Sequence, residues 1–178
     1  DERTVADYLV GEVLAGIPES QLEVLRCTSV ADPIPSALAV ELCGREDAAD
    51  LLDALARDLG LVTRWGPDRA EFRVQTMLRS YLAADLQRQG PDRVAALHRR
   101  AARWWDRRSR PAEALRHASR TADPVVVLDL VRRRAGTLVA SGEHGVLAAA
   151  LEAVDEAPTA DAWRAALSAH LLLHRGDV

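Results

Sequence analysis

Three prolines recur at a nearly constant spacing in the second half of this chain. Pro91, Pro124 and Pro158 lie 33 and 34 residues apart, and each stands where a helical pattern begins. Proline is favoured in the first turn of a helix because its missing N–H is not needed there. A helix pair that repeats every ~34 residues is typical of tetratricopeptide-type arrays, in which each pair buries an apolar face against the next. The spacing therefore predicts an α-solenoid.

The apolar pattern divides this region into helix pairs. The predicted helices cover residues 91–107, 111–121, 124–140 and 143–155. Their apolar faces consist mainly of Ala, Leu and Val, because only 4% of the chain is aromatic. Ala and Leu favour helix over strand. A third repeat begins at Pro158, and since the sequence stops at Val178 we expect it to be truncated after one helix.

The first half shows helical patterns followed by the only strand signal. The predicted helices cover residues 3–15, 18–28, 37–43, 47–59 and 75–88. Ser36 is predicted to cap the third of these, and Gly44 to end it. Two strand-like runs, 61–64 and 70–74, flank Gly66-Pro67-Asp68, a pattern that predicts a β-hairpin.

Helices followed by a two-stranded wing and a further helix form the layout of a winged-helix domain. We therefore predict a mainly α chain with two domains. Residues 1–89 are a winged-helix domain with a small β-hairpin wing, and residues 90–178 are TPR-like helical repeats.

The charges are strongly asymmetric along the chain. The net charge is −8 over residues 1–87, +8 over residues 88–134 and −4 over the remainder. The basic region contains a cluster on one predicted helix, formed by Arg99, Arg100, Arg103 and Arg107. This cluster is either an interface for an acidic partner or nucleic acid, or a solvated face that pairs with the acidic first half. We take it as the candidate partner-binding site.

The sequence lacks the residue sets that several kinds of catalytic and binding site require. There is no Lys in the sequence, so a phosphate-binding loop is excluded, and no spacing suggests a catalytic triad or dyad. His170 and His174 lie four residues apart, but nothing in their predicted helix completes a metal site. Cys27 and Cys43 are expected to be buried free thiols. We therefore predict no enzyme activity, no bound metal, no membrane span and a cytoplasmic protein.

The helix before the wing argues against DNA reading by this domain. In a DNA-binding winged helix it would enter the major groove. Here the predicted helix 47–59 and its approach carry five acidic side chains against a single Arg57. Because DNA affinity depends on neutralising phosphates, such a helix is repelled.

Four segments resemble a known family. They are VADYLVGEVL at 5–14, LRCTSV at 25–30, RVAALHRRAARWW at 93–105 and AEALRHA at 112–118. In this order they resemble the MalT-like, LuxR-family transcriptional activators, which are signal-transduction ATPases. The usual order in that family is a P-loop ATPase, a winged helix, a helical-repeat sensor and a C-terminal helix-turn-helix.

The resemblance implies a regulatory fragment. Its winged helix would couple an upstream ATPase module, which binds ATP or ADP, to repeats that sense an inducer or a regulatory protein. DNA would be bound only by a domain absent here. Gln75 stands where the family usually has a His that reaches the nucleotide phosphates. Glutamine donates a hydrogen bond but carries no charge. The alternative is a stand-alone winged-helix DNA-binding protein or a TPR-type adaptor.

Overall fold

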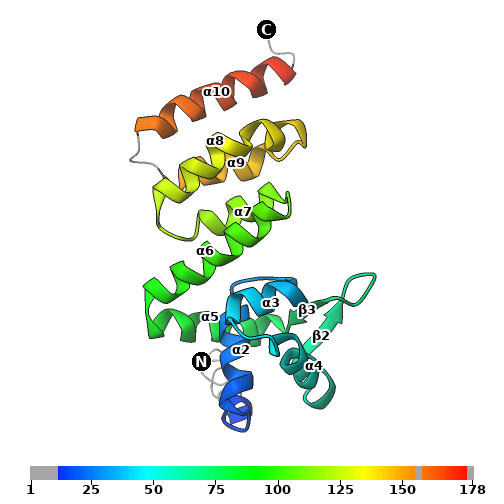
Figure 1. Cartoon of the computed structure of the whole chain (residues 1–178). Helices are drawn as coiled ribbons and strands as arrows, with labels where there is room; N and C mark the ends of the chain where they lie inside the picture. Colours follow the sequence, from blue (N-terminus) through cyan, green and yellow to red (C-terminus); the bar gives the residue numbers. More distant parts are fainter. Residues whose placement is uncertain (1–11, 155–157, 176–178) are drawn as a thin grey trace. The chain divides into compact units, whose positions relative to one another are not determined.

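The computed structural model of the protein describes residues 12–154 and 158–175. It is mainly α-helical with one small antiparallel sheet, as predicted (Figure 1). The chain forms two compact units, and the boundary between them falls between Leu97 and His98, within one helix. The domain boundary predicted after residue 89 lies just before that helix begins and stays a prediction.

The first unit contains four labelled helices and three short strands. In chain order they are α2 (Glu19–Thr28), β1 (Ile34–Pro35), α3 (Ser36–Cys43), α4 (Ala48–Asp58), β2 (Val62–Trp65), β3 (Glu71–Val74) and α5 (Thr76–Gln89). Residues 12–15 are also helical, and the rest of the helix predicted over 3–15 lies outside the described residues. This order confirms the winged-helix layout.

The predicted hairpin exists, and a third strand joins it. The strand order is β1-β3-β2, and both pairings are antiparallel. On the inner face, the Phe72 ring is fully buried and the Arg64 guanidinium lies 4.6 Å from its centroid. On the outer face, the Arg73 guanidinium stacks 4.0 Å from the centre of the Trp65 ring. The sheet therefore separates a buried face from a solvated one, as a two-residue period requires.

Ser36 does not cap α3, which corrects the prediction. The helix begins at Ser36 itself, with Pro35 in the cap position, and the Ser36 hydroxyl donates to the Ala70 carbonyl at 2.8 Å. This bond ties the start of α3 to the strand-side loop of the wing. The predicted end is confirmed, because Gly44 has a φ of 66° and its N–H donates to the Val40 carbonyl.

Ion pairs connect α2 to α5 and to Arg93 within the first unit. Arg26 on α2 bridges to Asp85 on α5 at 2.9 Å and to Glu19 at 2.6 Å. Glu23, one turn before Arg26, pairs with Arg93. Both cysteines are free thiols, as predicted; Cys27 is buried and Cys43 is half-buried.

In its described residues, 98–154 and 158–175, the regular structure of the second unit is helical. The helices are α6 (Pro91–Arg107), which begins in the first unit, α7 (Pro111–Ala118), α8 (Pro124–Ala140), α9 (His144–Glu152) and α10 (Pro158–Arg175). Each predicted helix of the repeats is present, and three of them begin at the prolines that define the spacing.

Small aliphatic side chains fill the core of this unit. α7 packs on both α8 and α9, and α9 packs on α10. Ala114, Ala118, Val131 and Leu138 are each fully buried in one continuous cluster. Trp104 is buried and meets Trp105 edge-on, so these two rings belong to the packing of α6. No helix in the described part is both long enough and apolar enough to cross a bilayer.

Two histidines meet inside the second unit. His98 on α6 is 5% exposed, and its Nδ1 lies 2.9 Å from Nδ1 of His117 on α7. Burial lowers the pKa of His98 to about 4. Burial also lowers the pKa of His117 to about 3, assisted by the charges of His98 and Arg120. Both rings are therefore neutral at pH 7, and one donates a hydrogen bond to the other.

The Phe72→Ala substitution is expected to lower the free energy of unfolding by about 3–5 kcal/mol, because it empties a fully buried site in the central strand. Trp65→Ala, at a ring that is 48% exposed, is the control and should cost less than ~1 kcal/mol. Urea denaturation followed by circular dichroism measures both. Equal losses for the two variants would contradict the buried role of Phe72.

The histidine pair is expected to make stability fall as the pH drops from 6.5 towards 4. The unfolded chain takes up protons near the ordinary histidine pKa, whereas the folded chain resists them down to the lowered pKa values. Each histidine then contributes a slope of at most ~1.4 kcal/mol per pH unit. Urea midpoints at pH 7.5, 6 and 5 test this. The double variant His98→Leu, His117→Leu should show a flatter profile over this window, and an unchanged slope would refute the assignment.

Candidate partner-binding site

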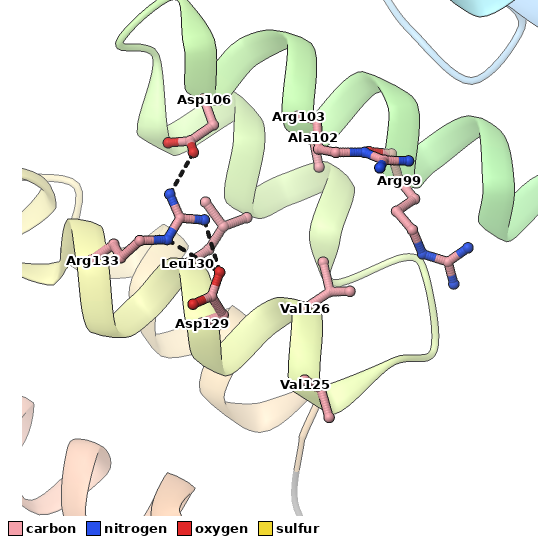
Figure 2. A pocket seen from close by; sticks show the side chains of 9 residues that line it. All are labelled: Arg99, Ala102, Arg103, Asp106, Val125, Val126, Asp129, Leu130 and Arg133. Carbon is pink, nitrogen blue, oxygen red and sulfur yellow. Dashed lines mark hydrogen bonds and ion pairs between the residues drawn. The ribbon is translucent and has the colours of Figure 1, made fainter.

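The second unit has a groove between α6 and α8, the first helices of successive pairs. Its volume is about 330 Å³. Figure 2 shows the side chains that line it, with aliphatic groups between two charged ends. Ala102, Val126 and Leu130 form the aliphatic part, and Val125 stands at the edge with 74% of its surface exposed. Val125 therefore leaves an aliphatic surface open to solvent at the start of α8.

Two of the predicted arginines lie at one end of this groove. Arg99 and Arg103 stand one turn apart on α6, as the i, i+4 spacing requires. A terminal nitrogen of Arg99 lies 3.7 Å from a carboxylate oxygen of Asp123. The other oxygen of Asp123 accepts a hydrogen bond from the Val125 N–H at 3.0 Å and so caps α8. Arg103 is exposed, and its Nε donates to the Arg99 carbonyl at 3.4 Å.

The other two predicted arginines lie elsewhere on the helix. Arg100 and Arg107 are both exposed, and neither lines the groove. At 100° per residue the four arginines share one arc of the helix about 100° wide, with Arg99 and Arg103 on one side of it and Arg107 and Arg100 on the other. Only the side with Arg99 and Arg103 borders the groove beside α8. The structure therefore brings together Arg99 and Arg103 alone from the predicted cluster.

The opposite end of the groove is neutralised internally. Asp106 accepts hydrogen bonds from Arg133 at 2.6 Å and from Arg134 at 2.7 Å. Burial opposes the charge on Asp106, but these two guanidinium groups outweigh it and lower the pKa of the carboxyl group. Arg133 also donates to Asp129 at 2.9 Å, as the dashed lines in Figure 2 show. This part of the groove therefore offers no net charge to a ligand.

No local pattern in the sequence indicates these acidic partners. Asp106, Asp129 and the valines of α8 become neighbours of the α6 arginines only when the repeats stack. The only signal that could have indicated them is the repeat itself: the first helices of successive pairs lie side by side in a stacked array, which brings residues near 99–106 close to residues near 125–133.

Gln75 lies in the first unit, between β3 and α5. It is the cap residue of α5, and its Nε2 donates to the Gly60 carbonyl at 3.1 Å. Its side chain is exposed. Two large apolar side chains in these two segments are also exposed: Leu59, next to Gly60, at 50%, and Met77, two residues after Gln75, at 63%. The Gln75–Gly60 bond brings their two segments together at the surface.

Metal ligation finds no support in the described residues. Within 12–154 and 158–175, no group of three or more His, Cys, Asp or Glu side chains is arranged to hold a metal ion. The side chains of His170 and His174, the two histidines with metal-ligand spacing in the sequence, lie outside the described part.

Comparison with known proteins agrees with this architecture. Residues 10–94 match the family described as the MalT winged helix domain. The HTH-type transcriptional regulator MalT of Yersinia pestis is 32% identical over 152 residues, which is 84% of this chain and 17% of that protein. Those of Serratia proteamaculans and Vibrio cholerae are 30% and 29% identical over 151 and 145 residues, covering 84% and 82% of this chain and 17% and 16% of those proteins.

The match therefore runs through the winged helix and well into the helical repeats. The chain spans about a sixth of the length of these curated relatives. The order of winged helix and stacked helix pairs, together with this similarity, leads to one assignment. The chain belongs to the MalT-like transcriptional regulators, and residues 10–94 are its MalT winged-helix domain.

Proposed function

We propose that this chain is the coupling segment of a MalT-like regulator. Its winged helix contacts an ATPase module that binds ATP or ADP, and its repeats receive an inducer or a regulatory protein. The relatives are named as transcriptional regulators, which supports a role in transcription control. The observation that carries the proposal is a winged helix whose usual reading helix is acidic and whose exposed apolar side chains lie beside Gln75.

The surface of α4 supports a protein-binding role over a DNA-binding one. Asp47, Asp50 and Asp58 are exposed on or beside this helix, while Asp53 is held by Arg64 of β2. Phosphates approaching this face meet carboxylates, so the usual gain from neutralising the DNA backbone is absent. In the complete regulator, DNA recognition then belongs to a different domain, and this module acts within a cytoplasmic protein.

The surface around Gln75 supports contact with the ATPase module. Leu59, next to Gly60, and Met77, two residues after Gln75, are large exposed apolar side chains in the two segments that the Gln75–Gly60 hydrogen bond joins. Apolar groups gathered at one place on a domain commonly mark an interface. The chain itself has no Lys for a phosphate-binding loop, so the nucleotide would be held by the neighbouring module and approached from this side. Hydrolysis is then not a property of this segment.

The isolated chain is expected not to bind duplex DNA at 50 mM or 200 mM salt, concentrations between which phosphate-dependent affinity changes steeply. Fluorescence anisotropy with a labelled duplex of mixed sequence measures this. Binding that weakens steeply with salt would favour the alternative, a stand-alone DNA-binding protein. The variant Asp50→Arg, Asp58→Arg is a positive control, because it converts two repelling groups on α4 into attracting ones.

In the complete regulator, Gln75→His is expected to tighten ADP binding about tenfold at pH 6, the equivalent of ~1.4 kcal/mol, because a protonated imidazole adds a charge that glutamine lacks. The gain should shrink at pH 8, where the imidazole is neutral. Titration with a fluorescent ADP analogue measures the dissociation constant. Gln87→His, the same replacement at an exposed site on α5, is the control. If the two variants bind the ADP analogue with equal dissociation constants, Gln75 does not lie at the nucleotide site.

A further inference from the structure

We infer that the groove between α6 and α8 binds an acidic peptide segment in which an aliphatic residue stands between two carboxylates. This inference rests on the proposed function, in which the repeats receive a protein partner, and it names the chemistry of that partner. It follows from three properties of the groove: a positive end that is only partly paired, an aliphatic surface and the spacing of its arginines.

The positive end is the first property. Arg133 already contacts two carboxylates, whereas Arg99 approaches Asp123 only to 3.7 Å. Arg103 forms no ion pair with any carboxylate in the described part of the chain, and it is exposed. Guanidinium groups bind carboxylates through two parallel hydrogen bonds, so this end of the groove selects Asp or Glu.

The aliphatic surface is the second property. Ala102, Val126 and Leu130 lie between the charged ends, and Val125 projects into solvent beside them (Figure 2). A volume of about 330 Å³ suits one or two aliphatic side chains. Ala102 and Leu130 are already buried, so the surface that a peptide covers belongs to Val125 and the half-buried Val126. Removing this apolar surface from water supplies affinity that a free anion cannot gain.

The spacing of the arginines is the third property. Residues one helical turn apart have Cβ atoms ~5–6 Å apart. In an extended peptide, side chains two residues apart point the same way and are separated by ~7 Å. Two carboxylates at positions i and i+2 therefore face Arg99 and Arg103 together. The residue between them points to the opposite side, towards the valines of α8.

Nucleic acid fits this groove less well than a peptide does. No aromatic side chain lines it, so bases have nothing to stack on. At the far end Asp106 and Asp129 are already paired with arginines, so that end offers no net positive charge to a continuous phosphate backbone. A peptide, by contrast, places its charges only where its sequence has them.

A peptide selection tests the inference on the complete chain. A random heptapeptide library displayed on phage is panned against the immobilised protein, and the most enriched peptide is synthesised with a fluorescent label. The expected consensus is Asp/Glu, then Leu/Ile/Val, then Asp/Glu. The dissociation constant for that peptide is then measured by anisotropy for the native chain and three variants.

Arg103→Ala is expected to weaken binding at least tenfold, since it removes one charge-assisted pair. Val125→Ser should weaken it several-fold, since it removes an aliphatic contact at an exposed site that folding does not need. Arg116→Ala, which removes another exposed arginine from α7, is the control and should leave affinity within twofold. Circular dichroism melts confirm that each variant folds.

Three outcomes would overturn the inference: no enriched consensus, a consensus without carboxylates, or an acidic consensus that binds Arg103→Ala and Arg116→Ala equally. A labelled single-stranded DNA that competes for the groove and loses affinity in Arg103→Ala would also overturn it, in favour of nucleic acid. If the selected peptides bind elsewhere on the repeats, the groove is not the peptide-binding site, although the proposed sensing of a partner by the repeats still stands. Salt-sensitive binding of duplex DNA by the native chain would count against the proposed function itself.

Discussion

The burial of small aliphatic side chains between neighbouring helices is the interaction on which the rest of this structure depends. A helix pair has apolar groups on more than one face, and a single pair cannot cover them all. Alanines such as Ala114 and Ala118 let the helix backbones approach closely, and leucines such as Leu138 fill the space between them. Stacking the pairs is therefore what creates the groove, because the groove exists only where α8 follows α6 at a fixed offset.

Much of the fold can be predicted from local sequence patterns. Prolines mark the starts of α6, α8 and α10, and Gly44 ends α3 with the left-handed backbone it was expected to adopt. The strand β1 escaped prediction, because two residues show no alternation and Pro35 lacks the N–H that a strand usually donates. Ile34 joins the sheet only because Phe72 lies opposite it in the fold.

The candidate site was predictable in part, for the same reason. The basic cluster was visible in the sequence, but which arginines act together depends on helix rotation and on the second repeat. Arg99 and Arg103 share the groove, whereas Arg100 and Arg107 do not. The His98–His117 pair was also missed, since each ring reads as an ordinary member of its helix until α6 and α7 pack. Non-local contacts of this kind carry no local pattern.

Asp123 gives the groove an internal competitor. Its carboxylate holds the first turn of α8 through one oxygen and approaches Arg99 through the other. A carboxylate that arrives from outside therefore does not find Arg99 vacant but exchanges with Asp123, so the net gain at Arg99 is the difference between two similar ion pairs. Arg103, Val125 and Val126 then decide which acidic sequences bind more tightly. The helix cap is kept throughout, so the exchange proceeds without unwinding α8.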